Sequence, residues 1–264
     1  MSKRLFQYPG SKSKLLGKIS PYFPRIVSLC EPFCGSAVVS LEITASSYYL
    51  NDRCKNIYNF FKVVRNDESR EKLIHMLEFT PCDEETWRSC DGKGDDVTRA
   101  WCFLVSYIYS FRALGRGFNR LNLAHGSNRI QSVNLFKKVD FLKSRYFRNW
   151  LSRVSVTNMD ALDFIGSINK RKTDGVFIYC DPPYVDAVQM YEGDEYKEED
   201  FKKLLDMLAD TPHRFMLSCY SSDLVQDYAS KYGWAQKSFS MKTIDMHARK
   251  QEFIFYNYKI GGLL

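Results

Sequence analysis

The chain has 264 residues, and its 45% hydrophobic and 15% aromatic content is enough for the core of one large domain or of a domain with an insertion. No stretch approaches the length of a membrane span, roughly 20 uninterrupted apolar residues, and the first residues lack the apolar run of a signal peptide, so we expect a soluble cytoplasmic protein with no membrane partner. The net charge is a modest +7. The eight cysteines are too scattered for a disulfide framework and lack metal-ligand spacing with any histidine, so no metal is expected.

The first third of the chain alternates between strand and helix patterns. The apolar run 26–30 predicts a strand that enters the turn 31–36, and a helix follows from about 37 to 44. A second strand is expected at 48–50, before apolar residues at helical spacing over 55–64. Such alternation favours a parallel sheet with crossover helices, whose ligands gather at the carboxyl ends of the strands.

The middle of the chain has a different pattern. From about 67 to 150 we expect helical segments, separated by the polar loop 91–96 and by the Arg- and Asn-rich stretch 112–129, without a strand of the parallel type. The alternation then resumes with predicted strands at 154–157, 175–180, 214–218 and 252–258 and predicted helices at 161–168, 197–208 and 223–232. We interpret the middle as an insertion into an α/β domain.

The tetrapeptide Asp181-Pro182-Pro183-Tyr184 follows directly on the buried strand predicted at 175–180. Its carboxylate accepts hydrogen bonds, its two prolines stiffen the backbone and remove two amide donors, and its aromatic ring offers a stacking surface. This combination suits an amino group on a flat ring. The two amino hydrogens would be accepted by the Asp181 carboxylate and by a carbonyl of the diproline turn, that of Pro182.

The same contacts would activate the amine. The lone pair of a ring-conjugated amine is delocalised, and holding its hydrogens away from the ring plane localises that pair towards an incoming methyl group. Tyr184 would stack on a base extruded from a duplex. The alternative is an ordinary strand-to-loop turn that stops at a proline. The position at the end of a parallel strand, where ligands collect, favours the functional interpretation.

A second candidate site is the turn from Glu31 to Ala37, also at a strand end. Gly35 relaxes the steric limit there and lets the backbone approach a ligand closely, although an ordinary crossover turn has a similar sequence. Asp52 follows the next predicted strand, where nucleotide-binding sheets place an acid that accepts hydrogen bonds from ribose hydroxyls. The alternative for Asp52 is a helix N-cap.

Basic residues are concentrated in one segment of the middle region. Between Phe111 and Arg148 the sequence has nine basic residues and one acidic residue, a net charge of +8, and six more bases without an acid precede Cys30. Such segments neutralise phosphates, whereas base edges are read by Arg and Asn side chains, and a solvated basic face is the alternative. The candidates for DNA contact are Arg112, Arg116, Asn119, Arg120, Asn122 and Arg129.

Taken together, these motifs resemble the signature of the Dam-like class of DNA adenine N6 methyltransferases, in the order typical of that class. The resemblance lies in Tyr8 to Lys12, Phe33-x-Gly35, Asp52 and Asp181 to Tyr184, and it covers the two flanking thirds of the chain. It implies a Rossmann-like methyltransferase sheet that binds S-adenosylmethionine, an inserted, mainly helical target-recognition domain, and direct methyl transfer to adenine of double-stranded DNA without a metal. The cell would be a bacterium or a phage-infected host.

The resemblance also implies domain bounds and residue roles. Residues 1–64 and 150–264 would form the cofactor-binding catalytic domain, and residues 65–149 the recognition domain. Lys12 would meet the carboxylate of the cofactor, and Asp52 its ribose. The full set of cofactor-binding candidates is Tyr8, Lys12, Phe33, Cys34, Gly35, Ser36, Asp52, Asp160, Ala161 and Asp181, and Asp181, Pro182, Pro183 and Tyr184 are the catalytic candidates.

Some features depart from the family pattern. Ala37 replaces the second glycine of the first motif, and the middle region lacks an obvious copy of the family's recognition hairpin; the stretch 110–118 resembles a Gly-rich variant of some phage-like members only loosely. A preponderance of phosphate contacts would predict relaxed sequence specificity, which is a hypothesis. Two alternatives remain. One is the same chemistry on RNA or on a protein amide, although relatives that modify amides generally carry Asn in place of Asp181. The other is a catalytically silent DNA-binding subunit.

Overall fold

The computed structural model describes seven stretches of the chain: residues 5–6, 12–110, 117–119, 128–171, 175–184, 196–242 and 249–260. By their internal contacts the residues divide into two compact units. One, called here the sheet unit, comprises Lys12–Arg53 and Thr157–Leu264, and the other, the helical unit, comprises Met1–Ser11 and Cys54–Val156. The two chain segments of the sheet unit flank the larger segment of the helical unit in sequence.

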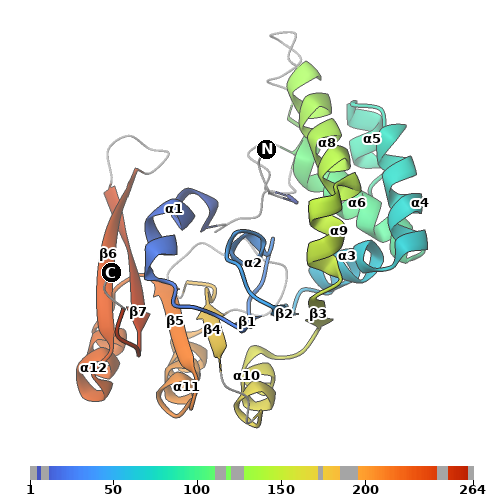
Figure 1. Cartoon of the computed structure of the whole chain (residues 1–264). Coiled ribbons are helices and arrows are strands. Elements are labelled where there is room, and N and C mark those ends of the chain that lie inside the picture. Colours follow the sequence, from blue (N-terminus) through green and yellow to red (C-terminus); the bar gives the residue numbers. More distant parts are fainter. Residues whose placement is uncertain are drawn as a thin grey trace. The chain divides into compact units, whose positions relative to one another are not determined.

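Seven strands form one mixed sheet (Figure 1). The strands are β1 (Ser28–Glu31), β2 (Ser47–Asn51), β3 (Val154–Thr157), β4 (Val176–Cys180), β5 (Arg214–Cys219), β6 (Ala235–Lys242) and β7 (Arg249–Tyr256), in the order β3-β2-β1-β4-β5-β7-β6. β1 pairs in parallel with β2 and β4, and β4 with β5, whereas β7 runs antiparallel to both of its neighbours. The predicted α/β, Rossmann-like fold class is confirmed, because consecutive parallel strands are joined through helices.

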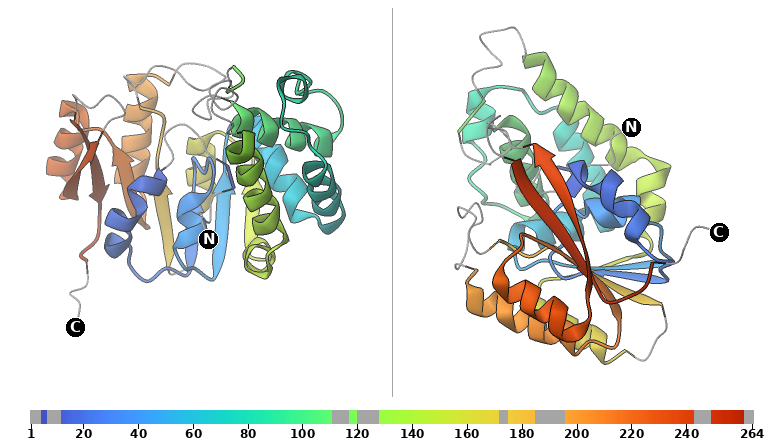
Figure 2. Two further views of the ribbon diagram at one scale, coloured as in Figure 1. Left: turned by 90° about the horizontal axis from the view of Figure 1, so that it is seen from above. Right: turned by 90° about the vertical axis from the view of Figure 1, so that its left-hand side faces the viewer.

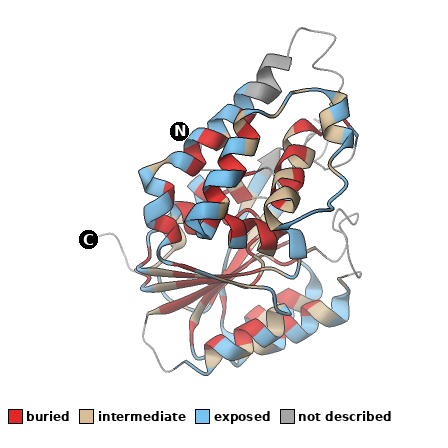
Figure 3. Cartoon of the chain, turned by 90° about the vertical axis from the view of Figure 1, so that its right-hand side faces the viewer, coloured by how far each residue is buried: buried red, intermediate tan, exposed pale blue. Residues whose placement is uncertain are grey.

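Helices cover both faces of the sheet within the sheet unit. α10 (Ala161–Asn169), α11 (Glu198–Ala209) and α12 (Asp223–Tyr232) lie side by side on one face, and α1 (Leu16–Ile19) and α2 (Val38–Glu42) lie on the other (Figure 1). The strands between them are largely buried (Figure 3). All five residues of β4 are buried, which explains why this strand is a continuous apolar run in the sequence.

The core under α10, α11 and α12 is made of aliphatic and aromatic side chains at helical spacing. Phe164, Ile165 and Ile168 of α10 and Leu204, Leu205 and Leu208 of α11 pack with Phe215 and Phe255 of the strands in one cluster. Polar side chains set the starts of these helices: Asp160 accepts a hydrogen bond from the amide of Leu162, and Ser222 from that of Val225. This packing fixes the carboxyl ends of β4 and β5.

One strand was not predicted from the sequence. β6 is the edge strand and forms a long antiparallel pair with β7 (Figure 2). Most of its residues from Ala235 to Ser240 are exposed, so they have neither the continuous apolar run nor the strict alternation on which strand prediction depends. The 3-10 turns η1 (Lys12–Lys14) and η2 (Ser20–Tyr22) and the short helix α1 were not predicted either.

The described elements of the helical unit before β3 are helices. They are α3 (Lys55–Arg65), α4 (Asp67–Glu78), α5 (Glu84–Arg88), α6 (Asp96–Tyr109), α8 (Asn128–Lys143) and α9 (Arg145–Leu151). Aromatic rings fill their core. Phe6 contacts Phe60 of α3 and Phe103 of α6 edge to face, with ring centroids 5.3 and 5.0 Å apart, and Phe147 stacks on Trp150 of α9.

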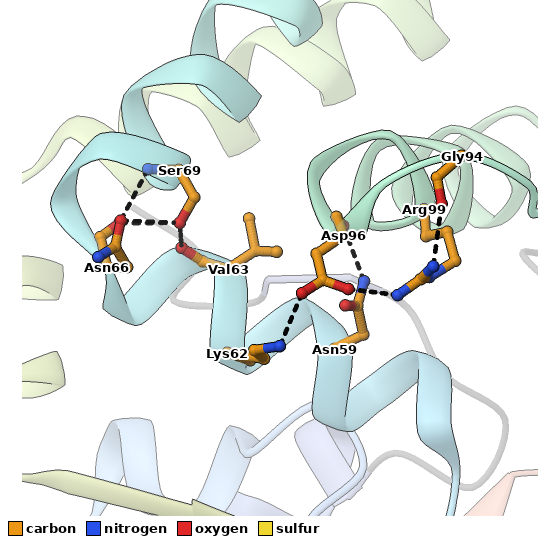
Figure 4. Close-up of polar contacts among 8 residues, drawn as sticks. All are labelled: Asn59, Lys62, Val63, Asn66, Ser69, Gly94, Asp96 and Arg99. Carbon is orange, nitrogen blue, oxygen red and sulfur yellow. Dashed lines mark hydrogen bonds and ion pairs between the residues drawn. The ribbon is translucent and has the colours of Figure 1, made fainter.

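Polar contacts join the helices of this unit at the start of α6 (Figure 4). The Asp96 carboxylate accepts from Lys62 Nζ at 2.7 Å and from Arg99, and Asn59 Nδ2 donates to the Asp96 carbonyl at 2.8 Å. Asn66 caps α4 by accepting from the amide of Ser69 at 2.9 Å. These bonds tie α3 to α6 and set the turn between α3 and α4.

Two absences apply to the described residues alone. No helix among them has the length and apolar character needed to cross a membrane. Within the same residues, no three or more His, Cys, Asp or Glu side chains come together in a way that could hold a metal ion.

Candidate active site

Asp181-Pro182-Pro183-Tyr184 lies at the carboxyl end of β4, the central parallel strand of the sheet unit. β1 and β5 flank β4 in parallel, so the turn after β1 and the residues after β5 reach the same edge. Asp181 and Tyr184 are partly buried. The structure thus gathers the predicted catalytic residues and the predicted glycine turn at one edge of the sheet, where ligands collect in such folds.

Lys12 brings a buried positive charge to this site. Its ammonium nitrogen lies 2.8 Å from Asp181 Oδ1, 2.6 Å from the hydroxyl oxygen of Tyr184 and 3.8 Å from Glu252 Oε1, and only 3% of the residue is exposed. The same nitrogen lies 4.8 Å from the centroid of the Tyr184 ring. A buried ammonium group that is satisfied in this way holds the Asp-Pro-Pro-Tyr turn to the start of the sheet unit.

The charged groups of the site change one another's pKa values. Burial raises the pKa of Asp181 to about 6, although the ammonium group of Lys12 opposes this shift. Burial alone would lower the pKa of Lys12, but the carboxylates of Asp181 and Glu252 outweigh it and hold that pKa above its ordinary value. Asp181 is therefore ionised at neutral pH and can accept a hydrogen bond.

Tyr184 has aromatic and polar neighbours. Its ring lies 4.2 Å from that of Tyr220, centroid to centroid, at an interplanar angle of 50°. Its hydroxyl accepts from Lys12 and donates to Glu252 Oε1 over 3.5 Å. Burial raises the pKa of Tyr184 well above its ordinary value, so the ring stays neutral and offers a stacking surface.

The turn after β1 has the tight geometry that the sequence predicted. Gly35 has a φ of 48° and its amide donates to Asp52 Oδ2 at 2.8 Å. Ala37, which stands where the family has a second glycine, also lies in the left-handed region, with a φ of 51°. The N-cap of α3 is Cys54, so the alternative that Asp52 caps this helix is wrong. Phe33 packs its ring edge to face against Tyr196.

Glu31, the last residue of β1, is buried beside this turn. Its Oε1 accepts from both the amide and the hydroxyl of Ser40 in α2. Burial raises the pKa of Glu31 to about 8, and the two bonds from Ser40 oppose that shift. The contact fixes α2 behind the turn.

Asn51 joins three loops of the site, a role that the sequence did not reveal. Its Nδ2 donates to the carbonyls of Pro32 and Met159, at 3.0 and 3.1 Å, and its Oδ1 accepts from the hydroxyl of Thr157 and the amide of Met159, at 2.8 and 2.9 Å. The residue is fully buried. All four hydrogen-bonding positions of the amide are thus used, and the turn after β1 is fixed to the loop that leads to Asp160.

The structure describes the surroundings of some of the remaining candidate residues, whereas others lie outside the described residues. Asp160 is the N-cap of α10, of which Ala161 is the first residue. Cys34 and Ser36 are buried within the turn after β1, and the Cys34 amide donates to the Asn51 carbonyl. Asn119 donates its amide to the Tyr109 carbonyl. Outside the described residues lie Tyr8, Arg112, Arg116, Arg120 and Asn122, and of Arg129 only the backbone, in α8, is described.

Sequence reasoning missed Tyr220, Glu252 and Asn51. Tyr220 directly follows β5, and its position after a buried parallel strand is a signal that could have identified it. Asn51 is the last residue of β2 and precedes Asp52. Glu252 lies in β7, next to the apolar residues that end this strand. A polar residue at such a position can belong to a site or face solvent, and the sequence does not distinguish the two cases.

The fold and the site define a Rossmann-like enzyme scaffold with an acid, two prolines and an aromatic ring at its central strand. The family model for the D12 class of N6 adenine-specific DNA methyltransferases matches residues 8–243. The match covers most of the chain, and the chain belongs to this family.

Curated relatives carry matching names at modest identity. A DNA N-6-adenine-methyltransferase of Escherichia phage P1 is 26% identical over 226 residues, which cover 80% of this chain and 28% of that protein. Modification methylase StsI of Streptococcus sanguinis is 24% identical over 78% of this chain and 32% of its own length. Type II methyltransferase M1.LlaDCHI of Lactococcus lactis subsp. cremoris is 25% identical over 84% and 82%. The chain thus spans about a third or less of the first two relatives.

Proposed function

We propose that the protein is an S-adenosylmethionine-dependent methyltransferase that transfers a methyl group to N6 of adenine in DNA. One observation carries the proposal: Asp181, ionised and held by Lys12, stands with Pro182, Pro183 and Tyr184 at the carboxyl end of the central parallel strand. Membership of an N6 adenine-specific DNA methyltransferase family and the names of the relatives support the choice of DNA adenine.

The residues around the glycine turn fit the proposed cofactor. The left-handed backbone at Gly35 permits close approach of a ligand, and the carboxylate of Asp52, positioned by the Gly35 amide, is an acceptor suited to ribose hydroxyls. Asp160 would accept from the adenine amino group of the cofactor, and Phe33 offers an apolar wall. When bound, S-adenosylmethionine supplies an electrophilic methyl group.

The residues of the chain itself account for the activation of the acceptor amine. The Asp181 carboxylate and a carbonyl of the diproline turn accept the two amino hydrogens, and this localises the nitrogen lone pair towards the methyl group. Tyr184 stacks on the extruded base. Lys12 keeps Asp181 ionised and fixes the orientation of its carboxylate. Neither a covalent intermediate nor a metal is part of this proposal.

We further propose that residues 65–149 contain the target-recognition region and that the six Arg and Asn candidates from Arg112 to Arg129 contact DNA. The net charge of +8 between Phe111 and Arg148 supports this proposal. Relaxed sequence specificity follows if most contacts are with phosphates. Mapping methylated adenines on random-sequence duplexes tests that hypothesis, and one short motif that takes nearly all the methyl groups refutes it.

The assay for the function uses labelled S-adenosylmethionine with duplex DNA or RNA. We expect label in N6-methyladenine of DNA and its loss in Asp181→Ala, because removal of the acceptor removes transition-state stabilisation. Label on RNA alone would overturn the DNA proposal. DNA binding without any label would instead favour a catalytically silent subunit.

A further inference from the structure

Glu252 enters the active site from β7, far in sequence from the other site residues. In the pairing of β5 with β7, Cys219 faces Phe253, so Glu252 lies one residue beyond the paired region, at the level of Tyr220. Its Oε1 lies 3.8 Å from Lys12 Nζ and 3.5 Å from the Tyr184 hydroxyl. The strand thereby brings a second carboxylate to the lysine that already binds Asp181.

The direction of the hydrogen bonds gives Glu252 a specific task. An ammonium group can only donate, so the Tyr184 oxygen, 2.6 Å from Lys12 Nζ, accepts that bond. The hydroxyl group of Tyr184 must then donate its own hydrogen bond to another atom, and Glu252 Oε1 is the acceptor. Lys12 and Glu252 together therefore fix the rotation of the hydroxyl and the position of the ring.

The burial of Glu252 argues against a purely stabilising role. The residue belongs to a partly buried strand segment, and its Oε2 is buried without a hydrogen-bond partner among the described residues. Leaving a carboxylate oxygen in this state costs folding free energy. Stability alone does not explain an acid at this position, whereas its contacts with Tyr184 and Lys12 do.

We propose that Glu252 is a positioning residue for methyl transfer, which holds the hydroxyl of Tyr184 so that the ring presents its face to the target base. The inference rests on the proposed function. Glu252 does not touch the reacting atoms and acts through Tyr184. Its negative charge also balances Lys12, which is shared between two carboxylates.

The shared lysine couples Glu252 to Asp181 electrostatically. The groups that face Asp181 are Lys12 of η1, Glu252 of β7, Glu31 of β1, Cys219 of β5, and Tyr179, Cys180 and Tyr184 of its own segment. Glu252 raises the pKa of Asp181. Removal of its charge lowers that pKa, so the acid limb of activity moves to lower pH. A structural defect would not move this limb in that direction.

A double-mutant cycle tests the inference. Glu252→Gln should lower kcat on duplex DNA about tenfold, the usual order for losing a bond to a charged group, and leave the KM for S-adenosylmethionine within about twofold. In the Tyr184→Phe background the same substitution should lower kcat less than about twofold, because the hydroxyl is already absent. Gln251→Ala, an exposed neighbour on β7, is the control and should match the wild type.

A second measurement does not depend on turnover. The ¹³C resonance of the Tyr184 ring, assigned by its loss in Tyr184→Phe, should move in Glu252→Gln and stay in place in Gln251→Ala. An unmoved resonance, or an equal kcat factor in both backgrounds, overturns the inference. If Glu252→Gln does not fold, Glu252→Asp replaces it in both experiments. A wild type that methylates no DNA overturns the proposed function, and the resonance still decides the role of Glu252.

Discussion

At the scale of single residues, the ionisation of Asp181 determines the pH range of the site. Burial raises its pKa to about 6, and the ammonium group of Lys12 holds it from rising further. A protonated carboxyl group is a weaker acceptor than a carboxylate and presents an O–H donor, so it binds the amino group of the target less well. We therefore expect kcat/KM, which reports ionisation of the free protein, to fall as the pH drops through about 6.

Lys12→Gln tests this assignment. The substitution removes the nearby positive charge, so the pKa of Asp181 rises and the acid limb of the kcat/KM profile moves to higher pH, opposite to the effect expected of Glu252→Gln. The matched control is Lys18→Gln, because Lys18 donates to the carbonyl of Ser240 and is exposed. If the acid limb stays in place in Lys12→Gln, the acid limb does not report the ionisation of Asp181.

Asn51 supports a second prediction at this scale. In Asn51→Asp the two donors to the carbonyls of Pro32 and Met159 become an acceptor with the same shape, so buried oxygen atoms face one another. We expect a loss of about 3 kcal/mol of unfolding free energy and weaker binding of S-adenosylmethionine, measured by urea denaturation and calorimetry.

Asn56→Asp provides the control, because this asparagine is exposed in the first turn of α3, where a negative charge is tolerated. Equal stability of the two variants would show that the Asn51 bonds do not hold the loops together.

The residues that the sequence revealed and those that it did not differ in a physical way. Asp181 to Tyr184, Gly35 and Asp52 were predicted because each follows an apolar strand within a few positions of a turn-forming residue. Glu252 and Asn51 act through bonds to residues far away in sequence, such as Lys12 and Met159. Such roles depend on tertiary pairing, which a single sequence does not specify.

At the scale of elements, one glycine allows the starts of β4 and β1 to lie close together. Gly175 directly precedes β4, and it lies against Val27, which directly precedes β1. Gly175 has a φ of +77°, and a Cβ atom there would lie 2.5 Å from Val27 Cγ2. The Gly175 carbonyl accepts from the amides of Val27 and Ser28, which starts the β1–β4 pairing. A side chain at this position meets both backbone strain and a steric clash.

Gly175→Ala is therefore expected to destabilise the protein by about 3 kcal/mol, made up of strain and overpacking. Gly233→Ala is the matched control: Gly233 has a φ of +67° at the end of α12, but nothing lies within 4 Å of its Cβ position, so strain alone remains, about 1 kcal/mol. Val27→Ala combined with Gly175→Ala should recover part of the loss. Thermal unfolding measures all three, and equal losses in the two single variants contradict the clash.

Element prediction succeeded where burial was continuous. β4 and β5 have almost wholly buried residues, and their apolar runs made them recognisable. β6 escaped prediction because an exposed edge strand takes its stability from hydrogen bonds with β7 rather than from apolar side chains. The helices of the helical unit were recognised by type, and their contacts, such as the Asp96 cluster in Figure 4, were not.

At the scale of the whole molecule, the distribution of charge determines how DNA binding should respond to salt. The segment from Phe111 to Arg148 alone exceeds the net charge of the chain. If Arg112 and Arg116 neutralise phosphates, each alanine substitution should reduce the slope of log affinity against log salt by about 0.9 and weaken binding to all duplexes alike.

Lys143→Ala is the control for this prediction. Lys143 belongs to the same basic segment, but its ammonium group is paired with Glu78. We expect its slope to equal that of the wild type, in titrations of duplex DNA at several salt concentrations. Unchanged slopes for Arg112→Ala and Arg116→Ala would show that these two residues do not contact phosphates, and would favour a basic face exposed to solvent.

The site is drawn from both ends of the sheet unit, and this has a consequence for the order of events during synthesis. Lys12 leaves the ribosome well before its partners Asp181 and Glu252. β6 emerges before β7, the neighbour that joins it to the sheet. A nascent chain therefore carries Lys12 without its two carboxylates, and the cluster of Lys12, Asp181 and Glu252 forms only after β7 has been translated. We expect chains interrupted before Glu252 to transfer no methyl group to DNA.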